Sequence, residues 1–205
     1  VAMGDLDWYK PNWPNGAGLV KGLKKQNIQT VLITQPFVLT NSKNFDYTSK
    51  NGLLAKDTQG KTYVIPEFYF GQTGILDIFQ PATQQWFWSK YKKHIETGVS
   101  GWWGDLGEPE MHPSGIRHTR GKADDLHNVY GHYWTKMLAE NYKKEYPQVR
   151  PLILMRAGFA GSQRFGLIPW SGDVSRSWGG LRSQIPLALN MSLAGLAYMH
   201  SDLGG

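Results

Sequence analysis

Short apolar runs alternate with longer amphipathic stretches along most of the chain. Five runs rich in β-branched, aromatic or other apolar residues predict strands at residues 30–34, 99–105, 151–156, 166–173 and 195–202. Four stretches with apolar residues at helical spacing predict helices at residues 14–27, 82–97, 124–146 and 181–193. Because strands that are apolar on both faces and separated by helices form parallel sheets with the helices outside, the pattern predicts an α/β fold.

One segment, residues 39–79, departs from this alternation. Its Asp57-Thr58-Gln59-Gly60-Lys61 stretch is a turn signal, and the flanking residues are able to pair as a small hairpin. About 40 residues is long for a loop without structure, so we interpret this segment as an insertion with local structure of its own.

Charged or polar residues stand at the C-terminal ends of four predicted strands: Asp105, Arg156, Asp173, and Asp202 with His200. In a (β/α)₈ barrel the catalytic face lies at these strand ends. A doubly wound open sheet also binds ligands there, but the chain has no glycine-rich phosphate loop between a strand and a helix. The pattern therefore favours part of a TIM barrel.

Five strands do not close an eight-stranded barrel. The chain begins after a strand is due and stops directly after one. A smaller open α/β domain is one explanation, and an excerpt of a larger enzyme, which the abrupt ends favour, is the other.

Composition narrows the function classes. Aromatic residues make up 13% of the chain, nine of them tryptophans, which suits both core packing and sugar stacking. The net charge is +6, but the basic residues are scattered as pairs late in predicted helices, which argues against a nucleic-acid partner. There is no cysteine, and no apolar run approaches the ~18 residues of a membrane span.

Asp105 and Asp173 are the central candidates for chemistry. Each ends an apolar run, and each follows tryptophan, in Trp102-Trp103-Gly104-Asp105 and Trp170-Ser171-Gly172-Asp173. Glycoside cleavage needs two carboxyl groups that face each other across the anomeric carbon. The alternative is that either aspartate caps a helix or a turn. Arg156 lies on the strand between them, where a cation lowers the pKa of Asp105 by pairing, binds substrate hydroxyls, or forms a structural ion pair.

A metal site is a weaker alternative. Glu108, Glu110 and His112 alternate within five residues and are acceptable ligands for hard or borderline metals, but no other residue completes a shell. His127 and His132, in the next helix, fit packing or surface positions better. No cofactor motif is present.

Four ordered motifs resemble glycoside hydrolase family 31, whose members are retaining α-glycosidases and transglycosidases. They are Trp103-Gly104-Asp105-Leu106-Gly107-Glu108, the stretch from Arg156 to Arg164, Trp170-Ser171-Gly172-Asp173, and His200-Ser201-Asp202-Leu203-Gly204-Gly205. The resemblance spans nearly the whole chain and implies strands three to seven of the family's catalytic barrel. Within the family, the sequence from Gly104 to Pro113 is most similar to that of bacterial oligosaccharide 4-α-glucosyltransferases.

The resemblance implies that Asp105 is the nucleophile and Asp173 the acid/base, and that the substrate is an α-1,4-linked glucose oligosaccharide. Hydrolysis of a terminal glucose is the alternative to transfer, and a non-catalytic carbohydrate-binding module is a distant third reading. The predicted substrate-binding residues are Arg156, Trp170, Asp202, Trp103, Glu108, Phe37 and His200.

Other family features are expected outside this chain. They are an aspartate on the second strand, a histidine on the eighth and the flanking β-sandwich domains. Unpaired strand edges invite pairing with another chain, so we expect either dimerisation or a distorted half-barrel, and no activity of this segment alone. The resemblance suggests a bacterial protein that is periplasmic or secreted.

Overall fold

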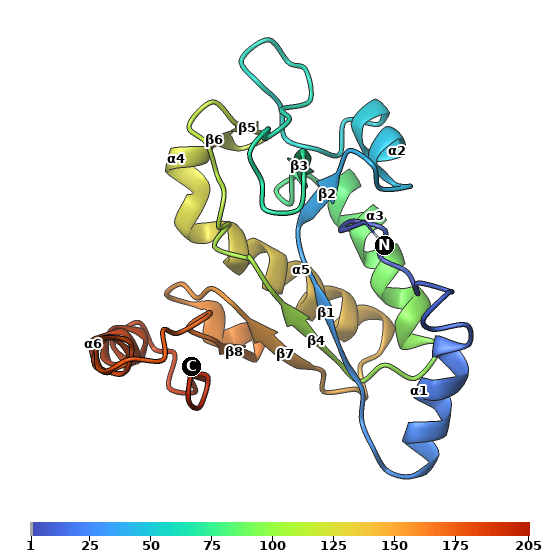
Figure 1. The fold of residues 1–205 in the computed structure, drawn as a ribbon, viewed down its shortest axis with the longest axis vertical. Coiled ribbons are helices and arrows are strands. Elements are labelled where there is room, and N and C mark those ends of the chain that lie inside the picture. The colour runs from blue at the N-terminus through green and yellow to red at the C-terminus, as the bar shows by residue number, and fades with distance from the viewer. Residues whose placement is uncertain (1) are drawn as a thin grey trace.

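A parallel sheet occupies the centre of the computed structural model, which describes residues 2–205. Its four strands lie in the order β1-β4-β7-β8 (Figure 1). Their bounds are β1 Val31–Thr34, β4 Gly101–Gly104, β7 Leu152–Met155 and β8 Leu167–Pro169. All three pairings are parallel, and each neighbour in the sheet is the next strand of the sheet along the chain. This confirms the predicted α/β fold with consecutive parallel strands, as in part of a barrel.

Helices connect these strands. The long ones are α1 Gly16–Lys25, α3 Pro81–Ile95, α5 Tyr130–Glu145 and α6 Trp178–Leu193. The short ones are α2 Phe45–Lys50, α4 Ala123–Leu126, and the 3₁₀ turns η1 His127–Val129 and η2 Ser162–Phe165. The helix expected at residues 124–146 is therefore divided into three pieces, and its last piece ends just before Pro147. No helix among residues 2–205 has the length and apolar character needed to cross a membrane.

The two faces of the sheet differ in burial. Trp102, Ile153 and Met155 point toward the helices and are at most 1% exposed. On the other face, Ile33 and Leu152 are each 45% exposed. The expectation that the strands are buried on both faces is thus wrong for residues 2–205, because helices cover one face alone. An apolar inner face is what a closed barrel fills with layers of side chains.

Two strand predictions need correction. The run at residues 166–173 leaves the sheet after Pro169, and Gly172 has a left-handed φ of +79°, which an extended strand does not accommodate. Residues 195–202 do not form a strand. They join β8 by one parallel bridge between Trp170 and His200, with His200 N–H donating to Pro169 O at 2.8 Å.

Residues 39–79 carry their own elements. Strand β2, Phe37–Leu39, pairs antiparallel with β3, Thr73–Ile75. Helix α2 comes between these two strands in the chain. At the expected turn, Asp57 N–H donates to Lys61 O at 2.8 Å, and Asp57 Oδ1 accepts from the backbone of Gln59 and Lys61. A second small hairpin pairs β5, Arg117–His118, with β6, Gly121–Lys122.

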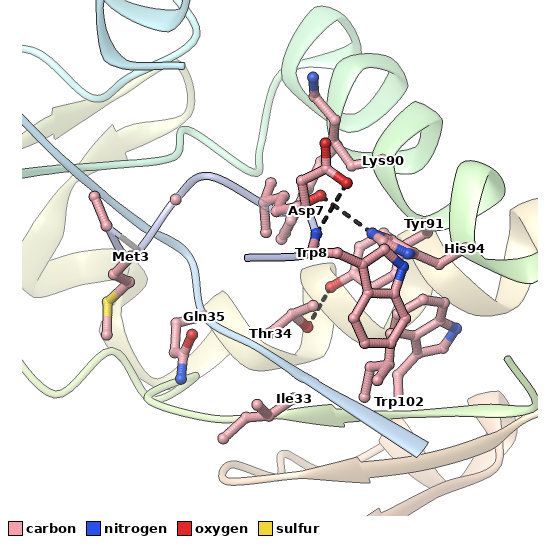
Figure 2. A pocket seen from close by; sticks show the side chains of 15 residues that line it. Met3, Asp7, Trp8, Ile33, Thr34, Gln35, Lys90, Tyr91, His94 and Trp102 are labelled. Atoms are coloured by element: carbon pink, nitrogen blue, oxygen red, sulfur yellow. Dashed lines mark hydrogen bonds between the residues drawn. The ribbon is translucent and has the colours of Figure 1, made fainter. Parts of the chain in front are cut away.

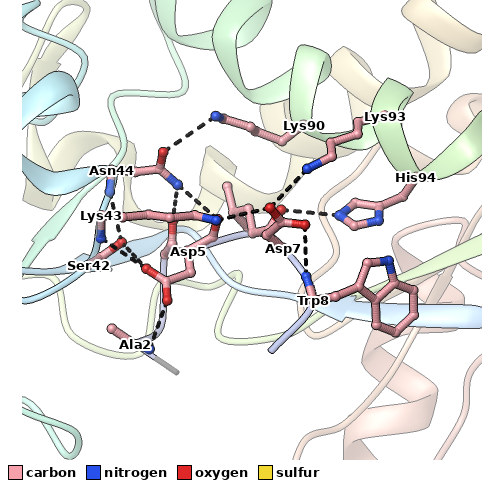
Figure 3. A network of polar contacts seen from close by, with 12 residues as sticks. Ala2, Asp5, Asp7, Trp8, Ser42, Lys43, Asn44, Lys90, Lys93 and His94 are labelled. Carbon is pink, nitrogen blue, oxygen red and sulfur yellow. Dashed lines mark hydrogen bonds and ion pairs between the residues drawn. The ribbon is translucent and has the colours of Figure 1, made fainter. Parts of the chain in front are cut away.

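Two aspartates fasten the segment before α1 to the neighbouring elements (Figure 3). Asp7 Oδ2 lies 3.0 Å from Lys43 Nζ and 2.9 Å from Lys93 Nζ. Burial raises the pKa of Asp7, but these two ammonium groups outweigh burial and hold the pKa well below its usual range. Asp5 Oδ1 accepts from the Ser42 hydroxyl at 2.9 Å. The segment is thereby held against α3 and the turn before α2.

Candidate active site

The register of the sheet places four polar or aromatic side chains in one row just beyond the strand ends. Three of them were predicted as site residues from the sequence. Ile33, Trp103, Leu154 and Ile168 are paired across the sheet. The ladder continues past the strands, since Asp105 N–H donates to Thr34 O at 2.9 Å and Arg156 N–H to Gly104 O at 2.8 Å. Because side chains alternate between faces, the residues two positions further on share the open face. They are Gln35, Asp105, Arg156 and Trp170.

The alternation is visible at the end of β1 (Figure 2). Thr34 points toward α3, where its hydroxyl lies 2.8 Å from Tyr91 Oη. Ile33 and Gln35 point to the other side of the strand. The pocket in this view has a volume of about 280 Å³ and is lined on the helix side by aromatic rings, including those of Trp8 and Trp102.

Asp105 is held in place by its backbone surroundings and by Arg156. Its Oδ1 accepts from Leu106 N–H at 2.9 Å and lies 3.5 Å from Arg156 Nη1. Leu106 has a φ of +57°, so the chain turns sharply directly after the carboxylate. Gln35, which sequence reasoning missed, is the neighbouring side chain on the open face and acts to lower the pKa of this carboxylate. Its position, two residues after Ile33 on an alternating strand, is the signal that predicts it.

Burial decides the net pKa of Asp105. Burial raises the pKa, and the charge of Asp173 adds to that rise. Arg156, Leu106 N–H and Gln35 act in the opposite direction, but the net pKa is raised. The expected effect of Arg156 on Asp105 therefore has the right sign, although it does not overcome burial.

Arg156 is surrounded by carboxylates. Its Nη2 is 2.6 Å from Glu108 Oε1 and its Nε donates to Glu108 Oε2 at 3.1 Å, and the same Nη2 also pairs with Glu110. Burial lowers the pKa of this guanidinium, but Glu108, Asp105 and Asp173 outweigh burial and raise it. Glu108 and Glu110 thus contact Arg156, whereas His112 contacts other histidines, so these three residues do not converge on one metal position.

Asp173 approaches the same guanidinium from the loop after β8. A Cβ at the preceding Gly172 would lie 3.0 Å from Arg156 Cδ, so this loop lies directly against Arg156. The charge of Asp173 acts on both Arg156 and Asp105. The two predicted catalytic carboxylates therefore lie on opposite sides of Arg156 in the order of the strands.

Aromatic and polar residues flank this centre. Trp170 is 5% exposed, and its Nε1–H donates to Asp202 Oδ1 at 2.8 Å. His200 Nε2 is 3.6 Å from the same oxygen. The Trp103 ring meets the Trp170 ring edge-on, with centroids 5.2 Å apart. The structure thus brings together all the predicted residues except one.

Phe37 is the exception. It lies in β2, is 0% exposed and packs against Phe68 with ring centroids 4.6 Å apart. A fully buried ring has no face for a sugar, so we withdraw Phe37 from the predicted substrate-binding set.

The TIM-barrel domain of glycosyl hydrolases family 31 matches residues 2–205. The chain belongs to this family. It is 31% identical to the sulfoquinovosidase of Escherichia coli (strain K12) over 209 residues, which is 99% of this chain and 30% of that protein. It is 29% identical to alpha-glucosidase 2 of Bacillus thermoamyloliquefaciens, over 94% of this chain and 26% of that protein.

Solved structures of the family have the same fold. A dextranase of Flavobacterium johnsoniae in complex with glucose superposes with a TM-score of 0.89 at 30% identity, over 100% of this chain and 27% of that one. The chain therefore spans less than a third of these relatives. The similarity establishes the family and the barrel fold, and it does not single out the glucosyltransferase subgroup.

Proposed function

We propose that this segment supplies the catalytic centre of a retaining α-glycoside-processing enzyme that transfers glucosyl units between α-1,4-linked glucose oligosaccharides. The observation that carries this proposal is the row of Asp105, Arg156 and Trp170 on the open face, with Asp173 close enough to act on both charged groups. Family membership supports glycoside chemistry, since relatives are named as an α-glucosidase, a sulfoquinovosidase and a dextranase.

The first step is displacement at the anomeric carbon. A carboxylate oxygen of Asp105 forms a bond to this carbon while the glycosidic carbon–oxygen bond breaks, and Asp173 donates its proton to the leaving oxygen. In the second step Asp173 removes a proton from the acceptor hydroxyl, which attacks the same carbon and releases Asp105. Retention predicts that the two carboxyl groups lie about 5–5.5 Å apart in the working enzyme.

Arg156 favours the ionised form of the proposed nucleophile. Burial raises the pKa of Asp105, and Arg156 is the positive charge that opposes this rise. Trp170 and Asp202 form the wall for the reacting sugar. Both contacts to Asp202 use Oδ1, which orients Oδ2 to accept from a sugar hydroxyl.

The second sugar has aromatic surface available to it. Tyr69 is 62% exposed, and its hydroxyl donates to Glu110 Oε1 at 2.7 Å, which places this ring next to the Arg156 cluster. Phe70, which is 65% exposed, lies beside it with ring centroids 6.5 Å apart. Such rings favour a sugar acceptor over water, which is the difference between transferase and hydrolase.

Product analysis with maltotriose tests the proposal. The intact protein is expected to form a ladder of shorter and longer glucans with little free glucose. Glucose and maltose alone would instead support the alternative, an α-glucosidase that hydrolyses the terminal unit. Cleavage of a sulfoquinovoside or an α-1,6-linked glucan, with maltotriose left intact, would contradict the proposed donor.

A further inference from the structure

Four side chains form a continuous row beside the loop that carries Glu108 and Glu110. They are Asp77, His118, His112 and His127. His118 Nδ1 lies 3.2 Å from Asp77 Oδ1, and its Nε2 lies 2.7 Å from His112 Nε2. His112 Nδ1 lies 3.3 Å from His127 Nδ1. In each contact one partner must donate and the other accept, so the protons along the row are not independent.

The inner end of the row is buried and charged. The side chains of His118 and Asp77 are 0% and 5% exposed. Burial raises the pKa of Asp77, but hydrogen bonds from His118 and Thr119 outweigh burial and lower it. Asp77 is therefore an ionised carboxylate, which only accepts hydrogen bonds.

This carboxylate sets the direction of the whole row. His118 must carry its proton on Nδ1 to donate to Asp77, so in the neutral ring Nε2 accepts. His112 then donates from Nε2 and accepts at Nδ1, where His127 donates. One buried charge thus fixes the tautomers of three imidazoles in succession.

The groups that face His112 keep it neutral. They are His118 from β5, His127 from η1 and Tyr130 from α5, whose ring centroid is 6.0 Å away. Burial, together with the positive charge that His118 and His127 carry when protonated, lowers the pKa of His112 to about 3. Glu108 and Glu110, on its own loop, are paired with Arg156.

We propose that His112 is a positioning residue, which ties the loop of residues 105–113 to this row and thereby holds Glu108 and Glu110 on Arg156. Glu110 is two residues from His112, so the loop is attached on one side to Arg156 and on the other to two histidines. The row does not depend on the proposed substrate. The effect on turnover rests on the proposed function.

Histidine ¹⁵N spectra of the intact protein test the row without a substrate. At about pH 8 His118 is expected as the Nδ1–H tautomer and His112 as the Nε2–H tautomer, and His112 itself should stay neutral down to about pH 4 because its pKa is lowered to about 3. Thr119 N–H donates to Asp77 Oδ2 at 2.7 Å and so holds the amide oxygen of Asp77→Asn on its own side. The amide NH2 then faces His118 Nδ1 as a donor, so both tautomers should reverse. His132, whose Nδ1 lies 2.8 Å from Ser162 Oγ outside the row, is the internal control and should not change. Rapidly averaged rings in the wild type, or unchanged tautomers in Asp77→Asn, would overturn the row.

His112→Ala and His112→Gln test the positioning role. In His112→Ala the Arg156 Nε–H, which donates to Glu108, should exchange faster with solvent, and kcat should fall on the order of 10- to 100-fold. His112→Gln keeps a donor toward His118 and should recover most of the loss. A folded His112→Ala with wild-type Nε–H exchange contradicts the positioning role. Slow turnover of maltotriose by the wild type, with the expected ¹⁵N pattern intact, contradicts the proposed function and not the row.

Discussion

Arg156 is the residue on which the charges of the site converge. It pairs with Glu108 through two nitrogens, contacts Glu110 and lies 3.5 Å from Asp105. A planar guanidinium makes such a set of contacts, and a lysine ammonium does not. Arg156 therefore couples the acidic loop to Asp105, the proposed nucleophile.

Arg156→Gln tests the electrostatic part of this coupling. In the proposed mechanism Asp105 reacts as the carboxylate, so activity should be lost as the pH falls through the pKa of Asp105. Removing the positive charge takes away the largest influence that opposes burial, so the acidic limb of the kcat/KM profile should move up by about 1 pH unit or more. The exposed Arg182→Gln on α6 is the matched control. An acidic limb that stays in place would show that Arg156 does not govern the ionisation of Asp105.

Asp173→Asn distinguishes the proposed acid/base role of Asp173 from the proposed nucleophile role of Asp105. An activated aryl glucoside needs no proton on its leaving group, so its first step should survive while maltotriose turnover falls by about 10²-fold or more. Added azide, which needs no base to attack, should restore release of the sugar. Equal losses on both substrates would contradict the acid/base role.

Residue by residue, the strand-end rule predicted most of the side chains that the sheet brings into one row, and their roles stay predictions. Asp105, Arg156 and Trp170 follow apolar runs, and the register then aligns them. Phe37 also follows the end of an apolar run, but it belongs to a new strand, β2, whose side chains enter the core. The partners of His112 lie 6 and 15 positions away along the chain, and no sequence spacing identifies such contacts.

The packing of elements around the site depends on a close approach of α5 to the loops after β4 and β7. A Cβ at Gly131, in the first turn of α5, would lie 2.5 Å from Ala157 Cβ and 2.9 Å from Gly107 O. Both neighbours belong to loops of the candidate site, so the small residue lets the helix contact these loops directly. The predicted helix at 124–146 missed the break before this point because the amphipathic pattern continues across it.

Gly131→Ala and Gly22→Ala form a matched pair that tests this packing. Gly131→Ala should destabilise the intact protein by about 1–3 kcal/mol, because the added methyl group has no space. Gly22, within α1, has no atom within 4 Å of its Cβ position, so Gly22→Ala should stabilise by about 0.5–1 kcal/mol. Urea unfolding measures both changes, and a neutral Gly131→Ala would show that α5 does not need this close approach.

At the scale of the whole molecule, one face of the sheet is an exposed apolar surface. In a closed barrel the same face lines the interior. The inner face of the sheet is open at Ile33 and Leu152, and α6 carries Leu181, Ile185 and Leu189, each at least 57% exposed. The fold class was predictable because apolar periodicity records which residues face the helices. The exposure of the inner face was not predictable, because periodicity alone does not show what covers a strand.

Self-association of the 205-residue chain, expected from the sequence, stays a prediction. Sedimentation should show dimers or larger species at micromolar concentration, since within residues 2–205 β1 is an edge strand and the inner face of the sheet is apolar. Ile33→Lys places a charge on this face and should favour the monomer. A wild-type chain that stays monomeric at about 100 μM would contradict the prediction.

Covalent capture of the nucleophile is the most direct measurement of the central claim. The intact protein is incubated with a fluorinated glucosyl fluoride, which forms the glycosyl-enzyme quickly and releases it slowly, and its peptides are analysed by mass spectrometry. The expected result is one added fluoroglucosyl group on Asp105, with none in Asp105→Asn. A label on Asp173 or another residue, or no label in a protein that turns over glucosides, would contradict it.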